Sequence, residues 1–442
     1  MCPVLPPGPD QAPAIQMLRW FYRPIAFLED CRRRYGEAFS VSFVGFKSPM
    51  VLFSDPAAVK AVYSDQRNGL PPGRNVALEP MLGSRSVLLL EGREHLTRRR
   101  LMLPAFHGER MRTYEAIVRD AITREIDRWP VGEPFPLHPR MQAMALEVIL
   151  RAVFGVTSEE RLARLRSTLG QILGRTASPV AQLVALAAMR LGERGPWARF
   201  EQMLRSADDE LYAEIAERRE DPRLEGREDI LSMLVSARFE EGGGMSDAEL
   251  RDQLMTLLLA GHETTATALA WAFDLLLHNP AELERLREEL DGGDEAYLRA
   301  TVAEALRLRP VVPIAGRRLA EPLEIDGYDL PAGTDVTPAI WLTHTRPDVY
   351  EEPLRFRPER FLGDGPETYA WIPFGGGVRR CLGAAFAEFE MRIVLAEVAG
   401  RCRLEAAGGP ERVGRRNVTL SPRDGTRVRL LGRDPVRTPA AA

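Results

Sequence analysis

The stretch Phe374-Gly-Gly-Gly-Val-Arg-Arg-Cys-Leu-Gly383 is the most informative part of this chain, because it carries one cysteine, Cys381, from a glycine-rich loop into the start of a helix. The thiolate is the form of cysteine that binds metals. Arg379, Arg380 and the free N–H groups of the helix start are expected to lower the pKa of this thiol. The glycines leave the backbone bare, so the loop can turn sharply and lie against a flat group.

Two other kinds of site fit the residues around Cys381 poorly. Phosphate loops carry Lys and then Ser or Thr after the glycines, whereas this chain continues Val-Arg-Arg. A zinc site needs further ligands, and no second Cys or His lies at ligand spacing around Cys381. Thiolate, neighbouring cations and bare backbone together suggest the proximal ligand of a haem iron, where sulfur favours cleavage of the O–O bond.

The loop matches the pattern Phe-x-x-Gly-x-Arg-x-Cys-x-Gly at every fixed position, namely Phe374, Gly377, Arg379, Cys381 and Gly383. It therefore resembles the haem-thiolate signature of the cytochrome P-450 superfamily, in its soluble bacterial type. The resemblance implies a mainly α fold with a minor β-sheet region, the triangular helical haem domain of that family. It also implies haem b (iron protoporphyrin IX) with Cys381 as the axial iron ligand, and further haem contacts from the loop residues Phe374, Gly375, Arg379 and Gly383.

Length and composition fit one large globular unit. The resemblance implies a single haem domain over residues 1–442, with loose ends at about 1–13 and 435–442. The net charge of −4 gives no reason to expect nucleic acid or an anionic membrane as a partner. Four cysteines without disulfide spacing fit a reducing cytosol. No apolar run approaches the ~20 residues of a membrane span, and the N-terminus does not resemble a signal peptide. We therefore expect a soluble, cytoplasmic protein without a membrane anchor, and a monomer.

Helical periodicity dominates the chain. Apolar residues recur at three- and four-residue spacing over 25–34, 111–128, 141–154, 159–173 and 197–219. Ser246 and Glu249 have the spacing of a capping box at the start of a long helix that reaches about Leu277. Two further helices are predicted over 281–290 and 296–308. Short alternating runs predict strands over 39–43, 50–54, 319–325 and 428–431.

The segment Ala260-Gly-His-Glu-Thr-Thr265 lies in the middle of that long helix. A glycine in a helix interior costs about 1 kcal/mol relative to alanine, so it needs a reason. Small residues would let a flat cofactor and a diatomic ligand approach, and Thr264 lies one turn on over the same face. The segment resembles the oxygen-activation motif of the family, in which Thr264 steadies the oxygen and Glu263 relays protons. His262 points off this face, so we expect it not to be a ligand.

Two arginine-containing groups are expected to support the haem. Glu304 and Arg307 stand at i,i+3 on one predicted helix, and the resemblance pairs them with Arg360 in a buried structural network. His95 and Arg99 stand at i,i+4 and resemble the helix that binds the haem propionates. The resemblance adds Arg379 and one arginine of Arg317-Arg318. We choose Arg317, with Arg318 left open because one residue of strand register would exchange them.

Substrate contacts are expected from the segments 70–87, 179–197, 257–264, 311–315 and 419–422, which are largely apolar. The substrate-facing residues nearest the iron would be Leu257, Ala260, Val311, Val312 and Ile314. A lipophilic substrate follows, such as a fatty acid, terpenoid, steroid-like or polyketide compound. The sequence leaves the choice among these open.

The predicted activity is a haem-thiolate monooxygenase that inserts one atom of dioxygen into its substrate. No flavin or iron–sulfur segment remains in the chain, so NAD(P)H-derived electrons would come from a ferredoxin and its reductase, or from a flavodoxin-type donor. Arginines near the Cys381 loop are a candidate docking area. Two competitors remain: a peroxide-driven or isomerising haem-thiolate enzyme, which the Glu263-Thr264 pair argues against, and a haem-binding sensor or carrier without turnover.

Overall fold

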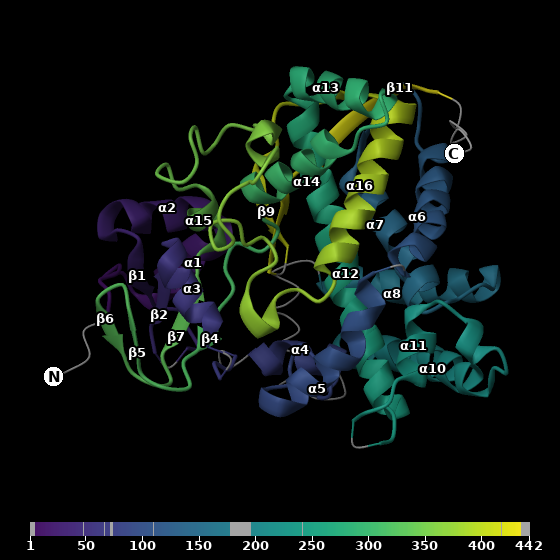
Figure 1. Cartoon of the computed structure of the whole chain (residues 1–442), viewed down its shortest axis with the longest axis horizontal. Helices are drawn as coiled ribbons and strands as arrows, with labels where there is room; N and C mark the ends of the chain where they lie inside the picture. The colour runs from purple at the N-terminus through teal and green to yellow at the C-terminus, as the bar shows by residue number, and fades with distance from the viewer. Residues whose placement is uncertain are drawn as a thin grey trace.

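A 31-residue helix, α12 (Asp247–Leu277), runs through the middle of the molecule (Figure 1). It begins with the predicted capping box: the Ser246 hydroxyl accepts from the Glu249 N–H, and the Glu249 carboxylate accepts from the Ser246 N–H at 2.7 Å. Most of its side chains are buried, since other helices surround it. The helix ends before Asn279-Pro280, where proline begins the next helix, α13 (Pro280–Asp291).

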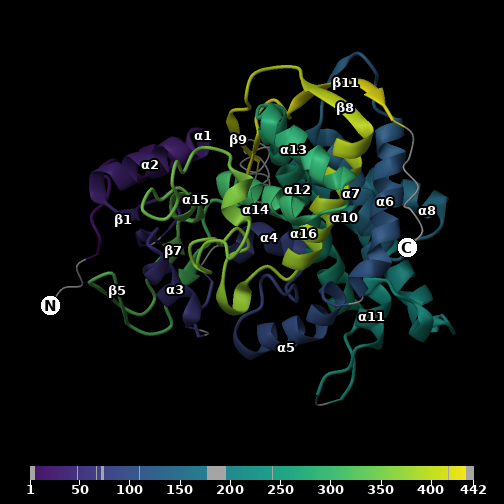
Figure 2. The same cartoon turned by 45° about the horizontal axis from the view of Figure 1, so that its top comes forward.

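The computed structural model describes residues 5–434, except 47, 66, 71–73, 109, 177–195, 241 and 417. Helices that pack on α12 form the larger part of the molecule, and Figures 1 and 2 both show α7 and α16 beside it. They bury one large apolar core against it. The remaining helices of this part are α4 (Arg74–Leu82), α5 (Gly92–Met102), α6 (Arg110–Asp127), α7 (His138–Val148) with a π-helical turn (Ile149–Val153), α8 (Glu159–Thr176), α10 (Pro196–Glu220), α11 (Ile230–Ser236), α14 (Ala296–Leu308) and α16 (Ala384–Arg401).

A smaller lobe, at the left of Figure 1, is built on a sheet of order β1-β2-β7-β4. Its strands are β1 (Ala38–Val41), β2 (Met50–Phe53), β7 (Asp335–Pro338) and β4 (Arg317–Arg318). β2 runs antiparallel to β1 and parallel to β7. Val51 and Phe53 join one apolar cluster while Met50 and Leu52 join another, so β2 is buried on both faces and reads as a continuous apolar run. The helices of this lobe are α1 (Pro13–Tyr22), α2 (Pro24–Tyr35), α3 (Pro56–Ser64) and α15 (Ile340–His344).

Three smaller β units complete the fold. One sheet has the order β3-β11-β8, and two hairpins are β5-β6 and β9-β10. In the β5-β6 hairpin, Asp326 and Gly327 both have positive φ, as a two-residue turn of this kind requires. The strands are β3 (Pro134–Pro136), β5 (Leu323–Ile325), β6 (Tyr328–Leu330), β8 (Cys402–Ala406), β9 (Val413–Arg416), β10 (Thr419–Pro422) and β11 (Arg427–Arg433).

The described elements depart from the sequence-based expectations at several points, among them one strand and the N-terminal segment. Of the strand expected over 319–325, only Leu323–Ile325 forms a strand, β5, and β4 lies just before the expected range. The N-terminal segment, expected to be loose over 1–13, is packed where it is described: the Pro7 carbonyl accepts from the Ser40 N–H at 2.9 Å. The expected loose end at 435–442 lies outside the described residues. Within the described ranges, no helix combines the length and apolar composition needed to cross a membrane.

Candidate active site

The Cys381 loop is closed by its own backbone. The N–H of Cys381 donates to the carbonyl of Phe374 at 2.9 Å, and the N–H of Gly375 donates to that of Ile372 at 3.0 Å. Gly375 and Gly377 have φ of 68° and 65°, a left-handed conformation that glycine adopts at low cost. The loop therefore sets Cys381 just before Gly383, the N-cap of α16.

The glycines of the loop are also needed for close packing on α3. A Cβ at Gly376 would lie 2.4 Å from a ring carbon of Tyr63, and one at Gly377 would lie 2.1 Å from the Tyr63 carbonyl oxygen. Both distances are too short for real atoms, so side chains at these positions would push the loop away from α3. The sequence analysis expected these glycines to let the backbone lie against a flat group. Gly376 and Gly377 instead let the loop lie close to Tyr63.

The Cys381 residue has exposed surface, while many protein atoms lie around its thiol. Burial is the main influence and raises the pKa of its thiol, while the Gly383 N–H, Arg380 and Arg99 oppose this shift. The sequence analysis expected the protein groups to lower the pKa of Cys381, but in this structure its pKa is raised. Arg379, expected to act on the thiol, instead donates to the Leu90 carbonyl at 2.7 Å and lies beside His95.

Four predicted haem contacts come together at one place. Burial lowers the pKa of His95 to about 4, and the positive charges of Arg379, Arg99 and Arg317 lower it further. These side chains come from α5, β4 and the Cys381 loop, which are far apart in sequence. Arg317 is buried, and its guanidinium lies 5.0 Å from the Tyr63 ring centre and 3.3 Å from the Gly376 carbonyl oxygen. In the described part of the chain, neither Arg99 nor Arg317 forms an ion pair with a carboxylate.

The neighbouring Arg318 points elsewhere. Its guanidinium binds the Asp335 carboxylate through two hydrogen bonds of 2.8 and 3.0 Å, within the β4-β7 pair. Successive residues of a strand face opposite sides, so only one of the two arginines can join His95 and Arg99. The structure brings Arg317 to this cluster.

The middle of α12 has an open stripe on an otherwise buried helix. Ala260 is exposed and Leu257, Gly261 and Thr264 are half-buried, whereas Leu258, His262 and Thr265 beside them are buried. The stripe follows the i, i+3, i+4, i+7 spacing of one helix face. The Thr264 hydroxyl donates to the Ala260 carbonyl at 2.5 Å. A Cβ at Gly261 would lie 3.2 Å from Ile149 Cδ1, so this glycine also lets α12 pack closely on the π-helical turn.

Glu263 is held by side chains from other elements. Its carboxylate accepts from the Gln142 amide at 2.6 Å and lies 3.3 Å from the Arg416 guanidinium of β9. The Thr267 hydroxyl lies 3.4 Å away and the imidazole of His138 3.7 Å away. Burial raises the pKa of Glu263, and Arg416 and Gln142 oppose this. A carboxyl with a raised pKa and a nearby cation is suited to exchange protons.

The two histidines near Glu263 are buried and neutral. Burial lowers the pKa of His138 to about 3 and that of His262 to about 4. His262 lies off the open stripe, as the sequence predicted. Among the described residues, no three His, Cys, Asp or Glu side chains converge as ligands of a bare metal ion.

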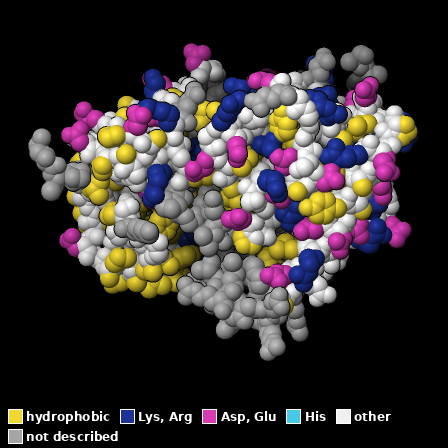
Figure 3. Space-filling model, turned by 90° about the horizontal axis from the view of Figure 1, so that it is seen from below, with side chains coloured by type: hydrophobic (Ala, Val, Ile, Leu, Met, Phe, Trp, Pro, Cys, Tyr) yellow, Lys and Arg dark blue, Asp and Glu magenta, His cyan; other side chains and the backbone are white. Residues whose placement is uncertain are grey.

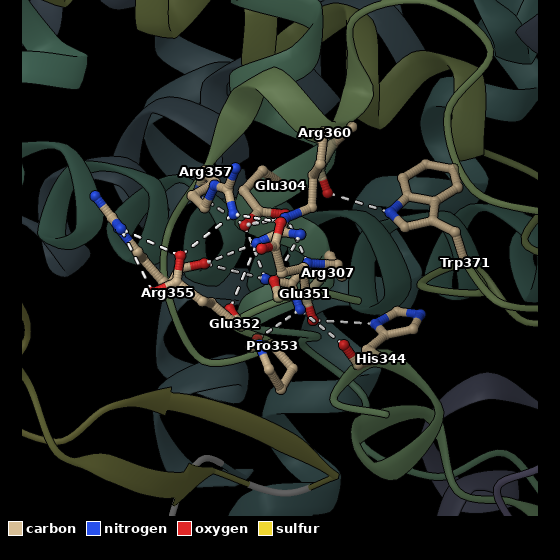
Figure 4. A network of polar contacts seen from close by, with 11 residues as sticks. Glu304, Arg307, His344, Glu351, Glu352, Pro353, Arg355, Arg357, Arg360 and Trp371 are labelled. Carbon is tan, nitrogen blue, oxygen red and sulfur yellow. Dashed lines mark hydrogen bonds and ion pairs between the residues drawn. The ribbon is translucent and has the colours of Figure 1, made fainter. Parts of the chain in front are cut away.

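Glu304, Arg307 and Arg360 meet in one polar network (Figure 4), in which Glu304 and Arg307 are fully buried and Arg360 is half-buried. The Arg307 guanidinium binds the Glu304 carboxylate at 2.6 and 2.7 Å, and both side chains have no exposed surface. Arg360 adds a third contact to Glu304 at 3.1 Å. Arg307 also donates to the carbonyls of His344 and Pro353 at 2.7 and 2.8 Å. The remaining donors and acceptors of this buried pair are thus satisfied by protein groups, which compensates part of the cost of desolvation.

Three side chains that the sequence analysis missed join this network to the Cys381 loop. The ring of His344 bridges the Arg307 carbonyl and the Ile372 N–H, at 3.0 and 2.8 Å. The Trp371 indole donates to the Ala303 carbonyl at 3.1 Å, and the Tyr350 hydroxyl donates to the Ala370 carbonyl at 2.9 Å. No sequence motif marks these three residues, because each one contacts a backbone atom that is distant in the chain.

The predicted substrate-facing residues do not all lie on one surface. Leu257 and Ala260 lie on the open stripe, and Val312 is half-buried. Val311 is buried, and its carbonyl accepts from the Leu420 N–H of β10 at 2.7 Å. Ile314 packs against the apolar cluster of the small lobe. Residues 179–195 of the predicted segment 179–197 lie outside the described residues.

These residues fit a haem bound through sulfur. A haem carries two carboxylates, and the cluster of His95, Arg99, Arg317 and Arg379 gathers positive charge with two arginines free of carboxylate partners in the described chain. Arg99 is also close enough to Cys381 to interact with its charge. A cysteine with exposed surface beside such a cluster offers one soft metal ligand and a site for anionic groups.

Comparisons with known proteins agree with this description. The family model described as cytochrome P-450 matches residues 6–427. Cytochrome P-450 135B1 of Mycobacterium tuberculosis is 42% identical over 435 residues, covering 96% of this chain and 91% of that protein. Cytochrome P-450 137 of the same species is 43% identical over 400 residues, covering 90% and 84%.

Two solved structures share the fold. A retinoic acid-bound cyanobacterial CYP120A1 superposes with a TM-score of 0.81 at 24% identity, covering 97% of this chain and 99% of that one. The haem domain of cytochrome P-450DA superposes with a TM-score of 0.84 at 21% identity, covering 98% and 99%. At these identities the likeness concerns the fold alone.

Proposed function

The chain belongs to the cytochrome P-450 family of haem-thiolate monooxygenases, and we propose that it oxidises a lipophilic substrate with electrons that a separate partner draws from NAD(P)H. The observation that carries this proposal is the exposed Cys381, which lies beside Arg99 of the His95 cluster, whose side chains we propose to bind the haem propionates. The haem, when bound, supplies the activation of dioxygen.

In this proposal Cys381 ligates the iron, and Arg99, Arg317, Arg379 and His95 hold the propionates. Gly375 and Gly377 let the loop adopt its closed form, and Phe374 accepts the hydrogen bond that fixes the Cys381 backbone. The network of Glu304, Arg307 and Arg360 positions the loop through His344. The residues of this network would hold the loop in position and would not contact haem or substrate.

Proton supply is assigned to Thr264 and Glu263. Glu263 takes up a proton on its carboxylate and releases it towards the open stripe, and the Thr264 hydroxyl donates at that stripe. Arg416 and Gln142 restrain the carboxylate between transfers. The apolar positions Leu257, Ala260, Val311 and Val312 would contact a lipophilic molecule and exclude water from it.

The electron donor is proposed to be a ferredoxin with its reductase, or a flavodoxin-type protein. Support comes from the family, whose members generally use redox partners. A haem-binding sensor or carrier is the competing function, and it shares the same ligand. The two differ in turnover, since only the enzyme consumes NAD(P)H and oxygen in proportion to product.

Two measurements test the proposal. The reduced carbon-monoxide complex should absorb where thiolate-ligated haem does, well to the red of histidine-ligated haem, and Cys381→His should move the band and abolish product formation. A Soret screen of lipophilic compounds, followed by turnover with a surrogate ferredoxin and reductase, then identifies the substrate class. An unchanged spectrum in Cys381→His would remove this residue as ligand. Haem spectra of the thiolate type without any turnover across the screen would favour the sensor.

A further inference from the structure

The segment of residues 83–90, between α4 and α5, is attached to α12 by side chains that no sequence motif marks. Gln253 bonds it from two sides: its Oε1 accepts from the Val87 N–H at 3.0 Å, and its Nε2 donates to the Arg85 carbonyl at 2.7 Å. The Asp252 carboxylate accepts from the Arg85 N–H at 3.0 Å. Two neighbouring side chains of α12 therefore satisfy three backbone groups of this segment.

Two hydroxyl groups add a directed chain of hydrogen bonds. Thr256 Oγ1 donates to the Asp252 carbonyl at 2.6 Å and lies 2.6 Å from Ser86 Oγ. A hydroxyl has only one proton, so Ser86 is the donor in the second contact. The Leu88 N–H in turn donates to Ser86 Oγ at 3.2 Å. The chain of bonds thus runs from the backbone of the 83–90 segment to the backbone of α12.

These polar contacts are buried. Figure 3 shows the molecule from the side that lies at the bottom of Figure 1, where α4 and α5 are, and acidic and basic side chains are interspersed on it. By contrast, Ser86 and Gln253 are 0% exposed and Thr256 is 2% exposed. Little water competes for hydrogen bonds in such surroundings, and breaking one leaves a buried polar group without a partner.

Gly83 lets the segment begin close to Asp252. Its φ of 79° is in the left-handed region, and a Cβ there would lie 2.0 Å from Asp252 Oδ1. Asp252 is itself held in place, because Arg251 donates to its carboxylate at 3.0 Å and to the Asp208 carboxylate of α10 at 2.7 Å. The glycine and the fixed carboxylate opposite it therefore set where the segment leaves α4.

The attachment lies at one end of the open stripe of α12. Gln253 stands one turn before Leu257 and two turns before Ala260, on the same helix face. Ala260 is exposed and Leu257 is half-buried, whereas Gln253 is buried with its polar atoms bonded to Arg85 and Val87. The open stripe therefore ends where the 83–90 segment crosses α12.

The other end of the segment reaches the His95 cluster. The Arg379 guanidinium donates to the Leu90 carbonyl at 2.7 Å, and Arg379 lies beside His95. Between the two ends, Val87 is buried in the large apolar core and Leu88 is half-buried. The segment thus connects the stripe proposed to meet the substrate with the side chains proposed to bind the propionates.

We propose that Asp252, Gln253 and Thr256 are positioning residues that hold residues 85–87 as a fixed wall of the substrate site. This rests on the proposed function, in which a lipophilic molecule lies along the open stripe. The wall limits how far a bulky molecule extends towards the start of α12, so Gln253 contributes to the selection of substrates by size. Gln253 acts through the backbone that it binds and does not contact the substrate.

The test measures both the mobility of the segment and the size of ligand that is accepted. Amide hydrogen exchange over residues 84–90 is followed by mass spectrometry in the haem-loaded protein, and imidazole, phenylimidazole and triphenylmethylimidazole are titrated against the Soret band. Gln253→Met keeps the length of the side chain and removes both hydrogen bonds. We expect faster exchange in the segment. The dissociation constant of the largest azole relative to the smallest should fall on the order of tenfold, the effect of one or two hydrogen bonds.

Gln16→Met is the matched control. Gln16 is likewise a buried glutamine bonded to backbone on two sides, since it accepts from the Ser42 N–H at 2.9 Å and donates to the Gln11 carbonyl at 2.8 Å, but it lies in α1 of the small lobe. This variant should lose a similar amount of stability and keep the wild-type azole ratio and exchange of residues 84–90. An equal change of the ratio in both variants would leave Gln253 with a general stabilising role and overturn the proposal.

Thr256 supplies a second pair of variants, which decides the matter if Gln253→Met does not fold. Thr256→Val removes the hydroxyl and Thr256→Ser keeps it, so only the first should loosen the segment and lower the azole ratio. Unchanged exchange in the variants that lose hydrogen bonds would show that these bonds do not hold the segment. Faster exchange with an unchanged ratio would show that the segment is no wall of the site. Either result overturns the proposal, and neither measurement needs turnover, so a failure of the proposed activity is seen separately.

Discussion

His344 connects the Glu304–Arg307 network to the cysteine loop: its Nε2 accepts from the Ile372 N–H at 2.8 Å, two residues before Phe374 begins the loop. Its Nδ1 lies 3.0 Å from the Arg307 carbonyl. Burial lowers the pKa of His344 to about 3, so the ring is neutral and one nitrogen remains an acceptor. A defect in the network is therefore expected to reach Cys381 through the backbone.

The first prediction concerns this network. Glu304→Ala leaves the fully buried Arg307 without its carboxylate, which should lower the free energy of unfolding by about 3–5 kcal/mol. The variant should also contain little haem. Glu295→Ala is the control, because Glu295 and Arg299 form an exposed pair near the start of the same helix, worth about 0–1 kcal/mol. Urea unfolding and haem content measure both, and a Glu304→Ala protein with wild-type values would contradict a supporting role.

The second prediction separates Arg317 from Arg318. Arg317→Gln should speed the loss of haem to an acceptor protein, because a buried cation of the His95 cluster is removed. Arg318→Gln should leave the rate of haem loss unchanged and lower stability by about 1–3 kcal/mol, since Asp335 then lacks its partner. The reverse pattern would mean that Arg318 meets the propionates.

The third prediction concerns oxygen activation. Thr264→Ala should keep haem and substrate binding and still consume NAD(P)H, but release its electrons as hydrogen peroxide. Thr264→Ser retains the hydroxyl and should remain largely coupled. Glu263→Gln should slow oxygen consumption on the order of 10²-fold, the lower end of what a general acid contributes. Product formed per NAD(P)H is the measurement, with haem content checked first. Wild-type coupling and rate in both Thr264→Ala and Glu263→Gln would refute the proton-supply assignment.

The fourth prediction is a pH dependence of stability at Glu390 of α16. Burial raises the pKa of this carboxyl from 4.5 to about 8. Between these values the folded protein keeps a proton that the unfolded chain has released. Stability is therefore lost as pH rises, by about 1.4 kcal/mol per pH unit. Glu390→Gln cannot ionise, so its advantage in melting temperature over the wild type should grow from about pH 5 to about pH 8.

Glu284→Gln serves as the control for this pH series, because Glu284 is an exposed glutamate of α13. Its difference from the wild type should not grow across the same interval. A constant difference for Glu390→Gln as well would show that Glu390 ionises in the folded protein as it does in the unfolded chain.

Local patterns in the sequence determined several features. The order of glycines, arginines and Cys381 identified the loop, because a turn followed by a helix start depends on neighbouring residues. The capping box of α12 formed as expected, since Ser246 and Glu249 need only each other. Glu304 and Arg307 at i,i+3 lie on one helix face wherever that helix packs. The helices over 110–127 and 247–277 also lie close to the predicted ranges.

Contacts between distant segments were decided only by the tertiary structure. The sequence analysis chose Arg317 but left Arg318 open. The register of β4 on β7 decides which of them faces His95, because one residue of register turns a strand side chain to the opposite face. Glu263 contacts Gln142, which lies 121 residues before it in the chain, and Arg416 of β9, which lies well after it. The sequence specifies which side chains are available. Packing decides which of them come into contact, because it sets the distances between residues that are far apart in the chain.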